Sequence, residues 1–451
     1  MGNSSPRTLR QRLKELVGAE FVFFEFNELR HFRVDGVLPR AVAAPADAEQ
    51  LAGLVDFLGK EGLSMAGRGG GTGLSQGQPP SRLDVLILTL RLDRIQEPDP
   101  QNSAVAVGAG IRLDELEHRL AGWNQRLPLN PPSTDLATLG GMIACNAAGP
   151  WRIRHGTMRE RSLGIKLVNA RGEIISTRES PGPNLAGLDL TRLLIGSLGT
   201  LGIMFEATVR LEPRPAKLQA LLAAFPTLAS ALAGAEGILG LGETPAFLEL
   251  VGPEAIQRMN PLPEGVALPR DQFVLAAAAE GGKDRVAELI EAYRADLSRS
   301  GAETIADLDH GIEWELDYIL QELYAETEGI LIQVSVPKAN LAPLFNRVSA
   351  LNADRGIRIG RMAHAGSGVA HLVLQPALDQ GWPSQLPQVA ADLADLAADL
   401  AGSLAVLSAP TAVKAQLPSL GLDGAEAEGR RRLKQEWDPH NLFNPGRLFQ
   451  T

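Results

Sequence analysis

The sequence has very little cysteine: Cys145 is the only one among 451 residues. A single cysteine excludes an intrachain disulfide, and it also excludes zinc and iron–sulfur sites built from cysteines. This usage is typical of a protein from a reducing compartment. Because Cys145 lies among Ile143, Ala144 and Ala147, we expect it to be a buried structural thiol.

The sequence also lacks an apolar leader and a long apolar run. Residues 1–7 contain no apolar segment, so they predict no signal peptide. The longest mostly apolar stretch, residues 218–241, contains Pro226 and Glu236, which makes it a poor membrane span. We therefore expect a cytoplasmic protein without a transmembrane segment, which would reach a membrane only peripherally, through partners.

The chain also has no excess of positive charge, since it contains 43 Lys and Arg and 53 Asp and Glu, which gives a net charge of −10. This balance argues against nucleic acid and against an acidic membrane surface as partners. Any phosphate group that the protein binds must therefore be held by local interactions, through backbone N–H groups and a few arginines.

Glycine, in contrast, is abundant and is concentrated in a loop at residues 67–77, directly after a short predicted strand. Glycine lacks Cβ, so such a loop can adopt positive φ and present successive N–H groups to one anion. Thr72 and Ser75 add hydroxyl donors. Neither Gly-Lys pair of the chain continues to Ser or Thr, and the glycine spacing differs from the Rossmann motif. We interpret the loop as a pyrophosphate cradle of another type; a flexible linker or wide turn is the alternative.

Two more glycine clusters follow along the chain. Gly140 and Gly141 are predicted to begin a helix whose N–H groups can face an anion or an electron-rich ring. In this cluster Asn146 can supply amide contacts and Gly149 is predicted to end the helix; packing alone is the alternative explanation of the glycine pair. The third cluster, residues 196–203, precedes a predicted strand.

The remaining pattern alternates helices and strands, which predicts the α+β class. The order of elements within 38–108 predicts one small α+β subdomain, and two prolines within 212–215 indicate a domain boundary. Asn340 is a candidate helix cap. Helices are expected at 8–18, 47–58, 113–120, 189–195, 227–235, 284–297, 341–351, 390–405 and from 430, and strands at 38–44, 84–90, 104–107, 163–170, 173–176, 206–211, 273–277, 330–336, 358–362 and 368–374.

Four motifs in a fixed order carry a resemblance to a known family. They are the loop at 67–77, Pro132-Ser133 with Gly140-Gly141 and Asn146, the loop at 196–203, and Asp438-Pro439 with Asn444-Pro445-Gly446-Arg447. In these motifs the chain resembles FAD-linked oxidases, in the D-lactate and glycolate dehydrogenase branch of the vanillyl-alcohol-oxidase (PCMH-type) flavoproteins. The resemblance implies an N-terminal helical segment (1–34), a two-subdomain PCMH-type FAD-binding domain (35–215), an α+β, ferredoxin-like cap or substrate domain (216–420), and a C-terminal segment (421–451) that returns to the FAD domain.

The resemblance implies that FAD is the cofactor. It also implies that the attachment is non-covalent, because the loop at 67–77 has no His or Cys, the residues through which some relatives tether the flavin. Residues 69–75 would hold the pyrophosphate, Gly199, Gly202 and Ile203 the adenine side, and Asn444 would lie near the isoalloxazine ring. The full set of implied FAD-binding residues is Gly67, Arg68, Gly69, Gly70, Gly71, Thr72, Gly73, Leu74, Ser75, Gln76, Pro132, Ser133, Thr134, Gly140, Gly141, Ala144, Asn146, Gly149, Gly199, Gly202, Ile203 and Asn444.

His364 and His371 occupy a segment in which family members usually bind a divalent metal. Where those members have Asp and Asn, this chain has Ser367 and Val369, and residues 408–413 lack the Glu and His of a later family motif. Two imidazoles without an anionic ligand make a weak site for a hard cation. We therefore predict no metal, and interpret the two histidines as hydrogen-bonded within the fold.

The family's substrate arginine usually follows a tryptophan closely, but Trp314 is followed here by Glu315, Leu316, Asp317 and Tyr318, with no arginine among them. Arg361 is the remaining candidate for a carboxylate clamp, and a solvated surface arginine is the alternative.

Together, the resemblance implies an FAD-dependent oxidoreductase that oxidises a small 2-hydroxy acid, of the glycolate or D-lactate class, by hydride transfer to flavin. His364 or His371 would be the base. The alternative is a non-catalytic FAD-binding subunit of a glycolate-oxidase-like complex, with a second flavoprotein and an iron–sulfur subunit as partners. The departures in the cap resemble that subunit.

Overall fold

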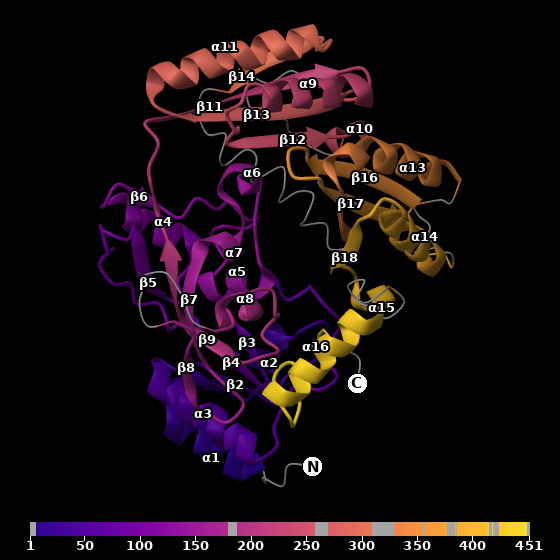
Figure 1. Cartoon of the computed structure of the whole chain (residues 1–451). Coiled ribbons are helices and arrows are strands. Elements are labelled where there is room, and N and C mark those ends of the chain that lie inside the picture. Colours follow the sequence, from indigo (N-terminus) through magenta and orange to yellow (C-terminus); the bar gives the residue numbers. More distant parts are fainter. Residues whose placement is uncertain are drawn as a thin grey trace.

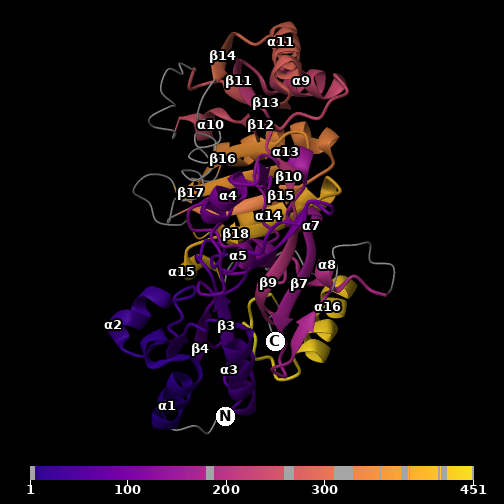
Figure 2. The ribbon, with the colours of Figure 1, turned by 90° about the vertical axis from the view of Figure 1, so that its left-hand side faces the viewer.

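The computed structural model describes residues 6–178, 187–257, 269–308, 329–354, 357–376, 384, 386–414, 417 and 424–448. These residues form a mixture of helices and largely antiparallel sheets, so the predicted α+β class is confirmed. One end of the molecule holds a large sheet with its helices, and the other holds two smaller sheets (Figures 1 and 2).

The first small sheet has the strand order β1-β2-β4-β3, in which β2, β4 and β3 run parallel. Helices α1 and α3 pack on it and bury Leu13, Leu54 and Leu58. Asp47 caps α3 by accepting a hydrogen bond from the Gln50 N–H at 2.8 Å, as expected for an Asp at a helix start. The elements are α1 (Pro6–Val17), η1 (Ala19–Phe21), β1 (Val22–Phe23), α2 (Phe26–Leu29), η2 (Arg30–Phe32), β2 (Ala41–Ala43), α3 (Ala48–Lys60), β3 (Met65–Arg68) and β4 (Val85–Leu88).

The second small sheet has the order β5-β9-β7-β8. The prediction of one subdomain over 38–108 is wrong, because β5 pairs with β9 in this sheet. Val105 and Val107 of β5 find their apolar contacts there, against α4 and α5. The elements of this region are β5 (Ala104–Gly108), α4 (Leu113–Ala121), β6 (Gln125–Arg126), α5 (Leu139–Cys145), α6 (Arg152–His155), α7 (Met158–Arg161), β7 (Ser162–Val168), β8 (Ile174–Ser176), α8 (Leu190–Leu194), β9 (Ile203–Arg210) and β10 (Glu212–Pro213).

Helix α5 is shorter than predicted. Its N-terminus is capped by Thr138, whose hydroxyl accepts from the Gly141 N–H at 3.3 Å. It ends at Asn146, which adopts a left-handed conformation with φ 50°, a common helix terminator. Gly149 therefore does not end the helix; a Cβ there would lie 1.7 Å from the Asn130 carbonyl oxygen, so glycine is needed for that close approach.

The large sheet is antiparallel, with the order β14-β11-β13-β12-β16-β17-β15-β18. Helices α9, α11, α13 and α14 cover one face and form the largest apolar core with it (Figure 1). The opposite face carries a second core that includes Trp151. The elements are β11 (Lys217–Phe225), α9 (Leu228–Gly240), β12 (Phe247–Val251), α10 (Pro253–Ile256), β13 (Phe273–Gly281), α11 (Lys283–Arg299), β14 (Thr304–Leu308), β15 (Ile330–Ser335), η3 (Lys338–Asn340), α13 (Leu341–Asp354), β16 (Ile357–His364), β17 (Val369–Pro376), α14 (Leu386–Asp399) and β18 (Ser403–Ser408).

One prediction for this region is wrong. The helix predicted over 390–405 ends at Asp399, because Ala401 adopts φ 55° and the chain then enters β18. Asn340, the candidate helix cap, precedes α13, and its side-chain amide donates to the Leu400 carbonyl at 2.9 Å.

The C-terminal segment returns to the first small sheet. After α15 (Thr411–Lys414) and α16 (Gly424–Trp437), the Asn444 N–H donates to the Met65 carbonyl at 2.7 Å, and the Met65 N–H donates to the Leu442 carbonyl at 2.8 Å. In Figure 1 this segment runs beside the half of the molecule that holds the small sheets. Among the described residues, no helix combines the length and the apolar character needed to cross a membrane.

Candidate functional site

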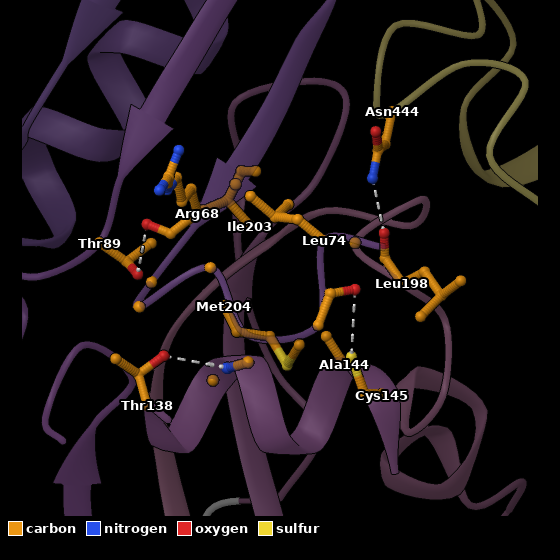
Figure 3. Close-up of a pocket in the computed structure, with 18 of the residues that line it drawn as sticks. Arg68, Leu74, Thr89, Thr138, Ala144, Cys145, Leu198, Ile203, Met204 and Asn444 are labelled. Carbon is orange, nitrogen blue, oxygen red and sulfur yellow. Dashed lines mark hydrogen bonds between the residues drawn. The ribbon is translucent and has the colours of Figure 1, made fainter. Parts of the chain in front are cut away.

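The three glycine clusters, far apart in the sequence, meet around one cavity (Figure 3). The loop after β3 forms one side, α5 another, and residues 198–204 a third, while Asn444 enters from the C-terminal segment. The lining consists of Gly67, Arg68, Gly69, Gly70, Gly71, Thr72, Gly73, Leu74, Thr89, Thr138, Gly140, Gly141, Ala144, Cys145, Leu198, Gly199, Gly202, Ile203, Met204, Asn444 and Arg447. We call it the glycine cavity.

At two of its glycines the loop lies so close to its neighbours that a side chain cannot be accommodated. A Cβ on Gly70 would lie 1.7 Å from the Leu136 carbonyl oxygen, and one on Gly73 would lie 2.3 Å from the Cys145 sulfur. At Gly199, in contrast, no atom of the described residues lies within 4 Å of an added Cβ. Glycine at 70 and 73 thus permits contact between the loop and the α5 region, whereas Gly199 faces open space.

Two buried cations hold the outer end of the loop. Arg447 donates to the carbonyls of Leu74 and Gln78 and pairs with Asp35. Lys414 donates to the Ser75 carbonyl at 2.5 Å and pairs with the same Asp35 at 2.9 Å. Burial lowers the pKa of Lys414, although the contact with Asp35 opposes this. No local pattern in the sequence reveals the pairing of this cluster, because Asp35 is separated from its partners by most of the chain.

The groups that line the glycine cavity fit a phosphate-bearing dinucleotide. Arg68 supplies positive charge beside the loop, and burial lowers its pKa without removing its charge at neutral pH. The Asn444 side chain donates to the Leu198 carbonyl at 2.8 Å. Its Oδ1 atom is buried without a hydrogen-bond partner among the described residues. A donor from a bound molecule would satisfy this acceptor, and FAD carries both phosphates and an N–H donor.

A second cavity, of about 400 Å³, continues from the first. The two share Thr72, Gly73, Gly141, Cys145 and Leu198. The second lies between the end of α5 and the large sheet, and we call it the sheet cavity. Its lining consists of Thr72, Gly73, Ser75, Gln76, Pro131, Pro132, Ser133, Ala137, Gly141, Met142, Cys145, Asn146, Ala147, Ala148, Arg152, Gly196, Leu198, Leu331, Gln333, His371, Ala405, Leu407, Ser408 and Leu448.

Most of the residues predicted from sequence to bind FAD line one of these two cavities. Thr134 and Gly149, both among the described residues, lie outside the lining of either cavity. Asn146 lines the sheet cavity, but its Oδ1 atom accepts from the Thr157 hydroxyl at 2.9 Å and from the Arg159 N–H at 3.1 Å. Cys145, predicted to be a buried structural thiol, is only partly buried and lines both cavities, although desolvation raises the pKa of its thiol to about 11.

His371 reaches the sheet cavity from the large sheet. It lies on β17 opposite Gln333 of β15, which in turn lies opposite Ala405 of β18, so the three side chains share one face of the sheet. Burial lowers the pKa of His371 well below 6.5, and the neighbouring charges of His364 and Arg152 act in the same direction. The imidazole is therefore neutral at pH 7.

His364 lies beside His371 and is bonded to a glutamate. The ring centroids are 5.1 Å apart, and the His364 Nδ1 atom lies 2.8 Å from both carboxylate oxygens of Glu249. Burial raises the pKa of Glu249 and lowers that of His364, so the pair is neutral overall and shares one proton. Among the described residues, no group of three His, Cys, Asp or Glu side chains is placed to hold a metal ion.

Arg361 is neither a carboxylate clamp of the sheet cavity nor a solvated surface residue, the two roles that the sequence suggested for it. It is 4% exposed, so it is not a solvated surface residue. Its guanidinium pairs with Glu254 and donates to Ser349 and to the Phe345 carbonyl, so it does not clamp a ligand in the sheet cavity. Strand alternation places it on the opposite face of β16 from His364. Trp314, the other landmark used for the substrate arginine, lies outside the described residues.

A buried charged cluster connects the large sheet to the rest of the chain. The Nδ1 atom of His155 lies 3.0 Å from Glu212, and its Nε2 atom lies 2.6 Å from Glu280 of β13. Burial opposes the charge, but the bonds to the two carboxylates outweigh it and raise the pKa of His155. The ring therefore donates from both nitrogens as an imidazolium. Arg126 and Arg154 also pair with Glu280.

Comparison with known proteins assigns this architecture. The family described as "FAD binding domain" matches residues 39–178, and "FAD linked oxidases, C-terminal domain" matches residues 214–448. The chain is 28% identical to the D-lactate dehydrogenase of Archaeoglobus fulgidus, over 92% of this chain and 93% of that protein. It is 25% identical to glycolate oxidase subunit GlcD of Bacillus subtilis (91% and 89% covered) and 26% identical to the D-2-hydroxyglutarate dehydrogenase of Xanthomonas citri pv. viticola (99% and 98% covered).

Solved structures agree in fold. The 4-ethylphenol oxidase from Gulosibacter chungangensis superposes with a TM-score of 0.73 at 17% identity, covering 97% of this chain and 96% of that one. An alkyldihydroxyacetonephosphate synthase gives 0.74 at 19% identity, covering 98% and 86%. The C-terminal family match alone spans more than half of the sequence, so this chain belongs to the FAD-linked oxidases, and FAD is its cofactor.

Proposed function

We propose that this protein oxidises a small 2-hydroxy acid, of the glycolate or D-lactate class, to the 2-oxo acid. The observation that carries the proposal is the neutral His371 in the sheet cavity, which is continuous with the glycine cavity. An imidazole that is neutral at pH 7 can accept a proton there. The D-lactate and D-2-hydroxyglutarate dehydrogenases among the relatives support the same reaction class.

In this proposal the three glycine clusters hold the cofactor, with residues 67–76 at the pyrophosphate and the Asn444 Oδ1 atom accepting from the flavin. Bound FAD supplies the two-electron acceptor. His371 takes the hydroxyl proton of the substrate while the C–O single bond of the substrate becomes a carbonyl. Because the ring is 4% exposed, bulk water has little access to that proton.

We also propose the division of the chain into functional parts. Residues 35–215 form the FAD-binding domain, which residues 421–451 complete, and residues 1–34 form an N-terminal helical segment. Residues 216–420 form the cap or substrate domain. The contacts of Met65 with Leu442 and Asn444 support the place of the C-terminal segment.

A second candidate function rests on residues 408–413, which contain neither Glu nor His. Here the protein is a non-catalytic FAD-binding subunit of a glycolate-oxidase-like complex, with a flavoprotein and an iron–sulfur subunit as partners. The glycolate oxidase subunit among the relatives supports an assembly of this kind. Any contact with a membrane would then be made through those partners.

Anaerobic reduction of the purified protein distinguishes the two functions. We expect bleaching of the flavin absorption band by glycolate or D-lactate, and a loss of at least about 100-fold in the rate for His371→Gln, the usual effect of removing a general base. A yellow protein that is inert to both acids but purifies with a second flavoprotein would favour the subunit. A protein that binds no FAD would overturn both candidates.

A further inference from the structure

We propose that Asp35, Lys414 and Arg447 form a clasp that couples FAD binding to the docking of the large sheet and of the C-terminal segment. The three are positioning residues, because they act on the cofactor through the loop at 67–78. This coupling goes beyond the proposed oxidation and does not depend on it, since it concerns only how the protein holds FAD.

The clasp joins three separate parts of the chain. Asp35 lies between η2 and β2, in the part that forms the first small sheet. Lys414 ends α15, and the preceding residue, Val413, is buried in the core of the large sheet. Arg447 belongs to the C-terminal segment, in which Phe443 is buried in a core of the first small sheet. The clasp is therefore complete only when all three parts are docked.

The two cations of the clasp hold carbonyl oxygens of the loop. Lys414 donates to the Ser75 carbonyl at 2.5 Å. Arg447 donates to the Gln78 carbonyl at 2.8 Å and to the Leu74 carbonyl, and the Gln78 N–H donates back to the Arg447 carbonyl at 2.9 Å.

These bonds also orient the N–H groups of the loop. In a trans peptide group the N–H points away from the carbonyl, so capture of the Leu74 carbonyl directs the Ser75 N–H away from Arg447. That N–H donates to no group among the described residues. The clasp thus fixes the peptide orientation in a loop that lines both cavities, and oriented N–H groups are what an anion requires.

The charge of the clasp also favours a phosphate-bearing ligand. The carboxylate of Asp35 lies 2.9 Å from the Lys414 Nζ atom and pairs with Arg447 as well. No second carboxylate of the described residues pairs with either cation, so the clasp carries one excess positive charge. The side chains of both cations are 2% exposed, and buried charges are screened little by salt. Arg447 also lines the glycine cavity, so this charge lies beside it.

A second contact ties the same loop to the large sheet. The Ser75 hydroxyl donates to the carbonyl of Leu407, on β18, at 3.4 Å, and α15 follows β18 along the chain. The loop therefore contacts both the cofactor cavity and the end of the large-sheet region. Thermodynamic linkage makes the effect reciprocal: if docking strengthens FAD binding, bound FAD strengthens docking by the same factor.

Titration of the apoprotein with FAD tests the clasp. We expect Lys414→Met to raise the dissociation constant for FAD about 10- to 100-fold, the usual range for a lost hydrogen bond to a charged group. Arg361→Met is the matched control, because it also removes a buried cation, which pairs with Glu254 and lines neither cavity. It should lower the Tm but leave FAD affinity unchanged.

Hydrogen exchange gives a test that requires no variant. The N–H groups of Val413 and Lys414 donate to the Pro410 carbonyl at 3.0 and 3.1 Å, so their exchange reports on α15. In the wild type, FAD should slow exchange over residues 411–414 at least about fivefold, because the cofactor stabilises the docked state. In Lys414→Met this protection by FAD should disappear. A lysine that only stabilised α15 would change exchange equally with and without FAD.

Two results would overturn the clasp: wild-type FAD affinity in a folded Lys414→Met protein, or exchange over residues 411–414 that does not respond to FAD in the wild type. An equal loss of FAD affinity in Lys414→Met and Arg361→Met would also overturn it, because that loss would reflect general destabilisation. None of these results affects the proposed oxidation of a 2-hydroxy acid, which is tested by reduction of the wild-type flavin with glycolate or D-lactate.

Discussion

Replacing Gly70 by alanine should weaken FAD binding strongly. The added Cβ would lie 1.7 Å from the Leu136 carbonyl oxygen, and that atom belongs to the backbone, so it cannot rotate away. The loop must therefore move away from the α5 region by more than an ångström. Overpacking of this kind costs about 1–3 kcal/mol. If FAD binding requires the undisplaced loop, that cost corresponds to a dissociation constant about 5- to 150-fold higher.

The assay is a titration of the apoprotein with FAD, followed by flavin fluorescence. Gly429→Ala is the matched control, because no described atom lies within 4 Å of an added Cβ there and the residue lies within α16. It should leave FAD affinity unchanged and stabilise the protein by up to about 1 kcal/mol through helix propensity. Wild-type FAD affinity in a folded Gly70→Ala protein would refute the assignment of the loop as the cofactor cradle.

Three further predictions concern ionisable groups. Because burial lowers the pKa of His371 well below 6.5, kcat/KM for D-lactate should stay level down to about pH 6.5 and fall only below it; a decline that begins at higher pH would contradict this role. The bond to His155 lowers the pKa of Glu212 from 4.5 to about 2, so the stability that Glu212 contributes to the fold should be complete above pH 4.5 and lost towards pH 2. The pKa of His155 is raised, so the stability that His155 contributes should be complete below pH 6.5 and lost as the pH rises above it. The Tm of the wild type should thus fall on both sides of this window, and Glu212→Gln should flatten both limbs; unchanged limbs would argue against the cluster. Finally, Lys434→Met leaves Asp438 buried without its 2.5 Å partner, which should cost about 3–5 kcal/mol in urea unfolding; adding Asp438→Asn should recover part of that loss, and a single variant within 1 kcal/mol of wild type would show that the pair matters little.

Local signals in the sequence identified much of the secondary structure. The helix predicted over 47–58 is found as α3, and the strands predicted at 163–170 and 173–176 are found as the paired strands β7 and β8. These features depend on residues only a few positions apart, so periodicity and turn chemistry suffice to find them. The glycine clusters could also be recognised, because few other roles explain such runs, and the structure brings them around one cavity.

Apart from the helix ends set by the positive φ of Asn146 and Ala401, the failures involve partners distant in the sequence. The order of elements in the sequence predicts β5 in one subdomain with β4, but β5 pairs with β9, about a hundred residues later. The sequence suggests an available cation at Arg361, because its pairing with Glu254 becomes visible only when β16 and α10 are in contact. His155, Glu212 and Glu280 form one cluster from three separate elements. Side-chain partners of this kind are set by tertiary packing, which single-residue patterns do not encode.

Helix α6 explains how a short segment outside the recognised motifs can matter for the site. Within five consecutive residues, Trp151 anchors the large sheet, Arg152 enters the sheet cavity, and His155 bridges Glu212 and Glu280. Its two ends are therefore fixed by the same contacts that hold the large sheet against the region containing α5. The position of Arg152 relative to His371 depends on that docking, because the two residues come from opposite sides of the cavity. The shape of the sheet cavity is thus a property of the docked arrangement, whereas the glycine cavity is built almost wholly on one side of it.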